Sequence, residues 1–158
     1  MLSRRALLGA GAVAGLGLAG CGAPDAPAVK ASDVMDTQLG VSRAALASYP
    51  STGETARLRQ RAKARVDRLE AALRLAGGSP GRQKAGKASP PGVERALAAE
   101  RLALRTHVAG VGLLSDRASR ELFAGLIAET AQAESELLTM LGRRPLETAF
   151  PGQPPNPR

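Results

Sequence analysis

The chain has 158 residues, a formal net charge of +8 and a single cysteine. This length fits one folded domain, and a lone cysteine excludes an internal disulfide, so the folded part must be stabilised by packing. Aromatic residues make up only 2% of the chain, too few for the stacking platform on which single-stranded nucleic acids bind, so no nucleic-acid partner is expected.

Residues 1–20 have the pattern of an export signal. Arg4 and Arg5 precede an uncharged run of Ala, Leu, Gly and Val at 6–19. A membrane-spanning helix needs about 20 apolar residues, so this run is too short to span a bilayer. The pattern therefore predicts a signal segment rather than a transmembrane anchor.

The end of this segment, Leu18-Ala19-Gly20-Cys21, resembles the lipobox of bacterial lipoproteins. The resemblance implies that Cys21 receives diacylglycerol, becomes the mature N-terminus and anchors the exported chain to the outer face of the cell membrane. An ordinary secreted protein with an accidental cysteine is the alternative. Residues 3–8 also resemble the twin-arginine motif, whose pathway exports folded proteins, although Leu7 replaces its usual phenylalanine. Twin-arginine and general export both stay open.

Residues 21–30 are predicted to be the lipidated N-terminus and a flexible tether, since they contain Pro24 and Pro27. A helical pattern then begins, with Ser32 or Asp33 expected as its N-cap and Pro50 as its stop. Its apolar stripe is Val34, Met35, Leu39, Val41, Ala45, Leu46 and Tyr49.

A second helix is expected to open at Ser51 and Glu54, which have capping-box spacing, and to end at Gly77 and Gly78. Its apolar stripe is Leu58, Ala62, Val66, Leu69, Leu73 and Ala76. The basic residues predicted on the opposite face include Arg57, Arg61, Lys63, Arg65 and Arg68.

This basic face has two interpretations. Removal of Arg4 and Arg5 with the signal leaves twenty basic and fourteen acidic residues, a formal charge of +6. Anionic phospholipid headgroups or acidic cell-wall polymers could therefore bind the basic helix as a second attachment beside the lipid. The alternative is an ordinary solvated helix face.

Residues 79–92, rich in Gly, Pro and Lys, are predicted to form a mobile loop, whose length permits a neighbouring or a crossover connection. Two helices follow, joined by a turn at Ser115 and Asp116 and closed by Gly142. The Pro-rich tail at 143–158 is predicted to be disordered.

The apolar stripes hold Val93, Leu97, Leu104, Val111 and Leu114 in the third helix, and Leu122, Phe123, Leu126, Ile127, Leu137, Leu138 and Leu141 in the fourth. Ala96, Ala103 and Gly110 add a ridge of small residues where two helices could approach closely.

Four amphipathic helices at 31–142, with no convincing strand pattern, predict an all-α fold, an antiparallel four-helix bundle. Glu100 and His107 lie within the stripe of the third helix. If the last two helices are antiparallel, Glu100 lies within a turn of Glu129, Gln132 and Glu134, and His107 lies near Phe123 and Ile127. Carboxylates at one level repel unless they hold a cation or pair with arginine, and Arg61 or Arg65 could reach them from the second helix.

Ala98-Ala99-Glu100, with His107 downstream, and the run from Ala128 to Glu134 resemble small ferritin-like domains of exported bacterial proteins. Metal-binding members of that class hold their ions with glutamates and two Glu-x-x-His motifs. This chain contains no Glu-x-x-His motif. His107 lies seven residues from Glu100, about 10 Å along a helix, too far for both to bind one ion.

Two hypotheses follow. The first is a non-catalytic binding or structural module at the cell surface, with no cofactor and no catalytic residue. The second is a metal-dependent redox or storage protein that binds iron or manganese at Glu100, Glu129, Gln132 and Glu134, with completion of the site across a homodimer left open.

Overall fold

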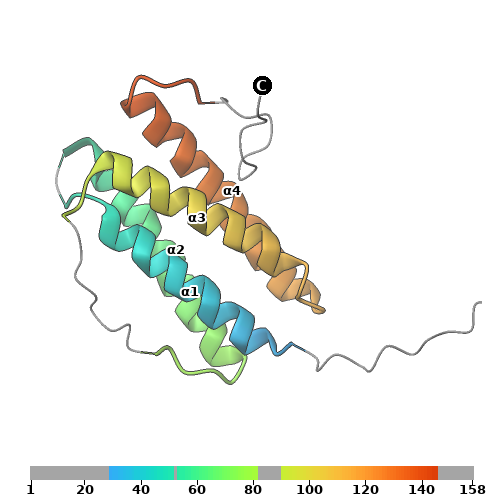
Figure 1. The fold of residues 1–158 in the computed structure, drawn as a ribbon. Helices are drawn as coiled ribbons and strands as arrows, with labels where there is room; N and C mark the ends of the chain where they lie inside the picture. The colour runs from blue at the N-terminus through green and yellow to red at the C-terminus, as the bar shows by residue number, and fades with distance from the viewer. Residues whose placement is uncertain (1–28, 52, 82–89, 146–158) are drawn as a thin grey trace, which may run out of the picture.

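The computed structural model describes residues 29–51, 53–81 and 90–145. These ranges form four α-helices, α1 (Ala31–Ser48), α2 (Ala56–Leu75), α3 (Val93–Val111) and α4 (Arg117–Met140), and one short 3-10 helix, η1 (Gly53–Thr55). The helices pack against one another, and no strand occurs in the described ranges, so the predicted all-α class is confirmed (Figure 1). The predicted signal at 1–20, most of the tether, the middle of the 79–92 connection and the tail from 146 lie outside the described residues.

The helix ends follow the glycine and aspartate signals of the sequence. Gly77 and Gly142 have left-handed backbones, with φ of 76° and 67°, a conformation that costs glycine little. Each is followed by an N–H that donates back into the last turn, as in the 2.9 Å bond from Gly78 to the Leu73 carbonyl. The Asp116 carboxylate accepts from the Ser119 N–H at 2.7 Å and caps α4, as one of the two expected residues.

Two predicted helix starts were wrong. The N-cap of α1 is Lys30, not Ser32 or Asp33, because the Lys30 carbonyl already accepts from the N–H groups of Asp33 and Val34. The predicted capping box at Ser51 and Glu54 does not open α2 directly. Gly53 has a φ of 81° and turns the chain into η1, so α2 begins only after the buried Thr55.

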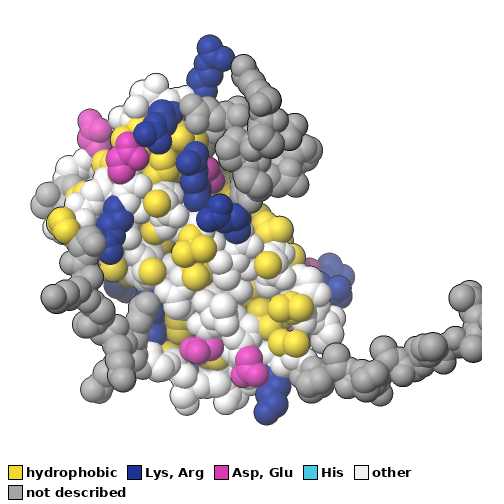
Figure 2. Space-filling model, in the orientation of Figure 1, with side chains coloured by type: hydrophobic (Ala, Val, Ile, Leu, Met, Phe, Trp, Pro, Cys, Tyr) yellow, Lys and Arg dark blue, Asp and Glu magenta, His cyan; other side chains and the backbone are white. Residues whose placement is uncertain are grey.

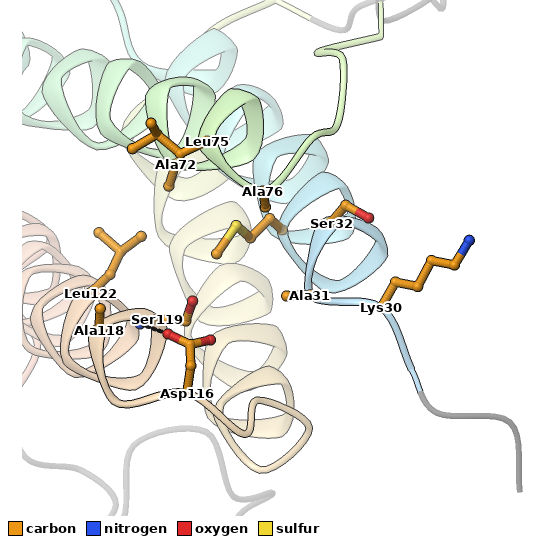
Figure 3. A pocket seen from close by; sticks show the side chains of 11 residues that line it. Lys30, Ala31, Ser32, Ala72, Leu75, Ala76, Asp116, Ala118, Ser119 and Leu122 are labelled. Carbon is orange, nitrogen blue, oxygen red and sulfur yellow. Dashed lines mark hydrogen bonds between the residues drawn. The ribbon is translucent and has the colours of Figure 1, made fainter.

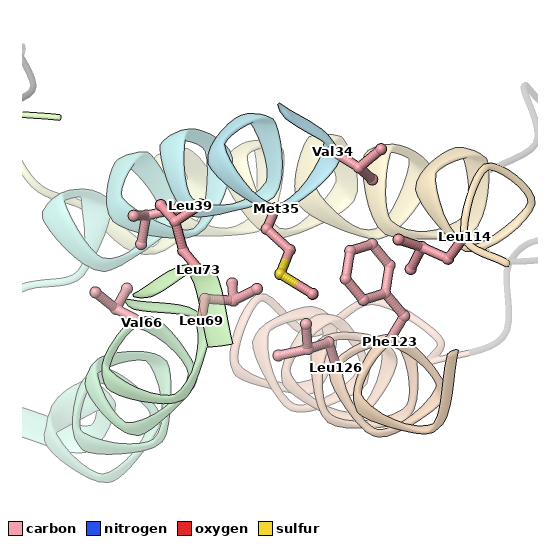
Figure 4. Packing of buried hydrophobic residues seen from close by; sticks show 9 residues of the cluster. All are labelled: Val34, Met35, Leu39, Val66, Leu69, Leu73, Leu114, Phe123 and Leu126. Carbon is pink, nitrogen blue, oxygen red and sulfur yellow. The ribbon is translucent and has the colours of Figure 1, made fainter. Parts of the chain in front are cut away.

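The apolar core consists of two clusters with residues from all four helices. Figure 4 shows the first, in which side chains from α1, α2 and α4 meet Leu114 of the turn between α3 and α4. Its buried members are Val34, Met35, Leu39, Val66, Leu69, Leu73, Leu114, Phe123 and Leu126. The second cluster holds Tyr49, Leu58, Ala62, Ala96, Leu97, Ala133, Leu137 and Leu138. Along α2, α3 and α4, buried polar residues occupy positions between the two clusters.

Helix α3 packs along both α1 and α4, and α1 also packs along α2. The expected ridge of small residues lies in this packing, since Ala96, Ala103 and Gly110 are all buried. A Cβ atom at Gly110 would come within 2.6 Å of Nε2 of Gln38 on α1. The absence of a side chain at Gly110 thus leaves room for Gln38, while a close approach of the two helix backbones along the ridge stays a prediction.

The two described ends of the connection between α2 and α3 lie against α1. Gly81 accepts a 2.6 Å hydrogen bond from Arg43 in the middle of α1, and the Gly92 N–H donates to the carbonyl of Ser48 at its end. The start of α3 therefore lies beside the end of α1. No helix in the described ranges has both the length and the hydropathy needed to cross a membrane.

Candidate functional site

The centre of the buried polar layer is Glu100, whose side chain has no exposed surface. Its Oε1 accepts from the Tyr49 hydroxyl at 2.6 Å and from the Arg65 guanidinium. A second Arg65 nitrogen donates to Oγ1 of Thr130 at 3.0 Å. Tyr49 follows α1, and the other three residues come from α2, α3 and α4, so the network joins all four helical segments.

Arg65 and Glu100 form a buried ion pair, with only 3% of Arg65 exposed. Burial raises the pKa of the Glu100 carboxyl above its ordinary value, and the attraction of Arg65 offsets this only in part. Burial and the neighbouring carboxylate also raise the pKa of Tyr49. The Tyr49 hydroxyl therefore stays protonated and donates a hydrogen bond to the Glu100 carboxylate.

A second carboxylate lies close to the first. Oε1 of Glu134 accepts from Nε of Arg101 at 2.8 Å, and the charge of Glu134 is one of the causes that raise the pKa of Glu100. The remaining oxygen, Oε2, of both Glu100 and Glu134 is buried and makes no hydrogen bond within the described residues. Such acceptors carry an uncompensated desolvation cost, so this layer is maintained at the expense of stability.

His107 belongs to the same layer but has a different role. Its Nδ1 lies 2.7 Å from Oε1 of Gln38, and its ring meets Phe123 edge-on at a centroid distance of 6.4 Å. The predicted proximity of His107 and Phe123 is confirmed. Burial, followed by the charge of Arg65, lowers the pKa of His107 to about 4. The imidazole is therefore neutral at physiological pH and serves as a hydrogen-bonded core residue.

The four predicted metal-site residues do not converge. Glu100 and Glu134 lie together in the layer, whereas Glu129 is half-exposed and pairs with Arg68, and Gln132 is exposed. Among the described residues, no group of three or more His, Cys, Asp or Glu side chains is arranged to hold a metal ion. The expected antiparallel packing of the last two helices placed the four residues at one level along the bundle. It could not determine which side of α4 each residue occupies.

The predicted basic face of α2 needs one correction. Arg65 is buried and cannot contact a surface, because it lies three residues after Ala62 and four before Leu69, on the apolar stripe. The outer residues are largely paired with acids. Arg57 and Arg61 both bind Glu136, and Lys63 binds Asp67.

Basic side chains also gather where α3 begins and α4 ends, as Figure 2 shows, with acidic side chains among them. There Arg101, Arg105 and Arg143 line a cleft of about 220 Å³ together with Glu94, which pairs with Arg143 at 2.9 Å. Because Glu134 pairs with Arg101 and Glu94 with Arg143, most of the positive charge of this cleft is compensated.

The sequence offered a usable signal for some partners that it did not identify. Gln38 and Ser42 lie four residues apart on the buried face of α1, and Thr130 lies between Leu126 and Ala133 on α4, so helical periodicity alone could have placed them in the core. Comparisons with protein-family models, curated proteins and solved structures found no match to this chain.

Proposed function

We propose that this protein is an exported, lipid-anchored, ferritin-like helical domain that acts as a non-catalytic binding or structural module at the outer face of the cell membrane. The observation that carries this proposal is the Arg65–Glu100 pair. In a metal-binding ferritin-like domain, cations held between the helices neutralise the inward glutamates. In this chain a guanidinium supplies that positive charge, so Glu100 is neutralised by the protein itself.

The proposed ferritin-like arrangement is supported by contacts between helix ends. Ser48 at the end of α1 meets Gly92 at the start of α3, which favours an antiparallel pair. Arg61 in the first half of α2 binds Glu136 late in α4, and Arg68 further along α2 binds the earlier Glu129, which favours a second antiparallel pair. One long connection between two helical hairpins is the connectivity of ferritin-like bundles.

Lipid anchoring rests on the sequence Leu18-Ala19-Gly20-Cys21. Cells that make the wild-type chain or Cys21→Ala should be labelled with a radioactive fatty acid and fractionated. The wild type should carry the label and sediment with the membrane, whereas the variant should lose both properties. An unlabelled wild type in the soluble fraction would refute the anchor.

The metal-dependent alternative retains one favourable observation, the unpaired buried oxygens of Glu100 and Glu134. Protein purified without a chelating tag should therefore be analysed for iron, manganese and zinc, and its melting temperature measured with each ion added. We expect less than 0.1 ion per chain, in order of magnitude, and an unchanged melting temperature, because binding of a ligand to the folded state would raise it. Saturable stabilisation that is lost in Glu100→Gln would favour the metal-dependent function.

A further inference from the structure

A cavity of about 640 Å³ opens at the end of the bundle where α1 and α4 begin and α2 ends. Figure 3 shows that side chains from these three helices surround it. The apolar part of its lining is Ala31, Met35, Ala72, Leu75, Ala76, Ala118 and Leu122. Its size falls within the range of about 300–1,000 Å³ that is usual for small-molecule sites.

The cavity is continuous with the apolar core. Met35 is a buried member of the first cluster, and Ala72 and Leu122 are half-buried residues packed against that cluster. Leu75, in contrast, is 90% exposed at the end of α2. The unbranched side chain of methionine adapts readily to the shape of a ligand. An apolar chain entering here would cover Leu75 and extend the existing core.

The mouth of the cavity carries positive as well as negative groups. Lys30 lines the rim, and in Figure 3 its side chain extends away from the cavity. The first N–H groups of α1 receive no side-chain cap from Lys30, and this positive end of the helix dipole favours an anion. Asp116 is the opposing charge, but its carboxylate already accepts from the N–H of Ser119. A small anionic headgroup is therefore best placed on the Lys30 side.

We propose that this cavity binds one long-chain fatty acid, with its acyl chain against Met35 and Leu122 and its carboxylate near Lys30. The apolar lining recognises the chain, because burial of each methylene adds to the free energy of binding. A free fatty acid is favoured over the lipid on the chain's own Cys21, because an esterified or amide-linked acyl group has no carboxylate for the mouth to bind. This site goes beyond the proposed function and does not depend on lipidation of Cys21.

The test uses the full chain with Cys21→Ala, which cannot be acylated, and the fluorescent fatty acid cis-parinaric acid. Fluorescence should rise to saturation at one probe per chain. Adding Ala72→Phe places a ring inside the cavity and should weaken binding at least tenfold. The matched control, Ala64→Phe, adds the same ring at an exposed position on α2 and should bind within twofold of the parent. Non-saturating fluorescence, or equal binding by both variants, would overturn the proposal.

Circular dichroism and melting curves should accompany each titration. If Ala72→Phe does not fold, Ala118→Trp fills the cavity from α4, and Ala124→Trp on an exposed turn of the same helix is its control. The apolar run at 6–19 is common to every variant, so binding to it would not differ between cavity and control substitutions.

Two further measurements define the ligand. Lys30→Glu should weaken binding of cis-parinaric acid several-fold at low salt and leave the corresponding long-chain alcohol unaffected; equal loss for acid and alcohol would overturn the headgroup assignment. A photoreactive fatty acid should label the cavity of the wild type in the membrane fraction and the cavity of Cys21→Ala in the soluble fraction. Labelling of Cys21→Ala alone would overturn the assignment to a free fatty acid and indicate that the chain's own lipid fills the cavity.

Discussion

The buried pair of Arg65 and Glu100 makes a sharp prediction about stability. Glu100→Gln keeps the shape of the side chain and an oxygen for Tyr49, but it leaves the Arg65 guanidinium buried without a counter-charge. Removal of one partner from a buried ion pair costs about 3–5 kcal/mol. A domain of this size loses about 4 °C in melting temperature for each kcal/mol, so Glu100→Gln should lower it by roughly 12–20 °C.

Removal of the other partner should cost less. In Arg65→Met the buried Glu100 can take up a proton, because burial already raises its pKa, whereas an arginine cannot lose its charge. The folded state of this variant then binds a proton that the unfolded state releases near pH 4.5. Its stability deficit should therefore shrink as the pH falls from 8 to 5.

Urea unfolding followed by circular dichroism measures these free energies. The double variant Arg65→Met/Glu100→Gln should lose less stability than the sum of the single variants, since neither charge remains. Glu129→Gln and Arg68→Met form a matched control on the half-exposed α2–α4 pair, where we expect losses of about 0–1 kcal/mol. Additive losses below 1 kcal/mol for Arg65 and Glu100 would refute the reasoning.

Three other predictions concern the core. Because the pKa of His107 is lowered in the folded state, a proton binds more tightly to the unfolded chain. Between pH 6.5 and 4 the free energy of unfolding of the wild type should therefore fall by about 3 kcal/mol relative to that of His107→Gln. Parallel curves of unfolding free energy against pH would contradict this. Gly110→Ala should destabilise by about 1–3 kcal/mol through close contacts, whereas Gly125→Ala, with open space around it, should stabilise by about 0.5–1 kcal/mol, and chemical denaturation of both variants distinguishes them. Leu104→Asp should cost several kcal/mol by burying an unpaired charge, while Leu102→Asp at a half-exposed site should change stability by less than about 0.5 kcal/mol; similar melting temperatures would argue against the buried face of α3.

Helical periodicity predicted most of the buried faces. Glu100, Leu104 and His107 were placed on one side of α3 from their spacing alone, and all three are buried. The glycines at 77 and 142 were identified as helix ends, and both have the left-handed backbone that ends a helix. These features depend on residues close in sequence, which explains why a single sequence was sufficient.

Features that depend on tertiary contacts were predicted less well. Arg65 was assigned to the outer face because it belongs to a run of basic residues, although its spacing from Ala62 and Leu69 places it inside. Its pairing with Glu100 was one of two alternatives left open, with Arg61 as the other. Glu129 was grouped with Glu100 because both lie near one level, yet it pairs outward with Arg68. Choice of partner depends on the rotation of each helix about its axis, which periodicity determines only to within a fraction of a turn.

The position of the polar network suggests why the core retains a costly ion pair. Tyr49 and Arg65 belong to the first helical hairpin, whereas Glu100 and Thr130 belong to the second. Leucine and alanine clusters can slide past one another with little change in buried area, but these hydrogen bonds are made in one register only. We therefore infer that the network fixes how the hairpins align rather than how strongly they attract. On this basis the double variant Arg65→Met/Glu100→Gln should keep its helix content while its amide NMR signals broaden, and a sharp, fully dispersed spectrum would contradict the inference.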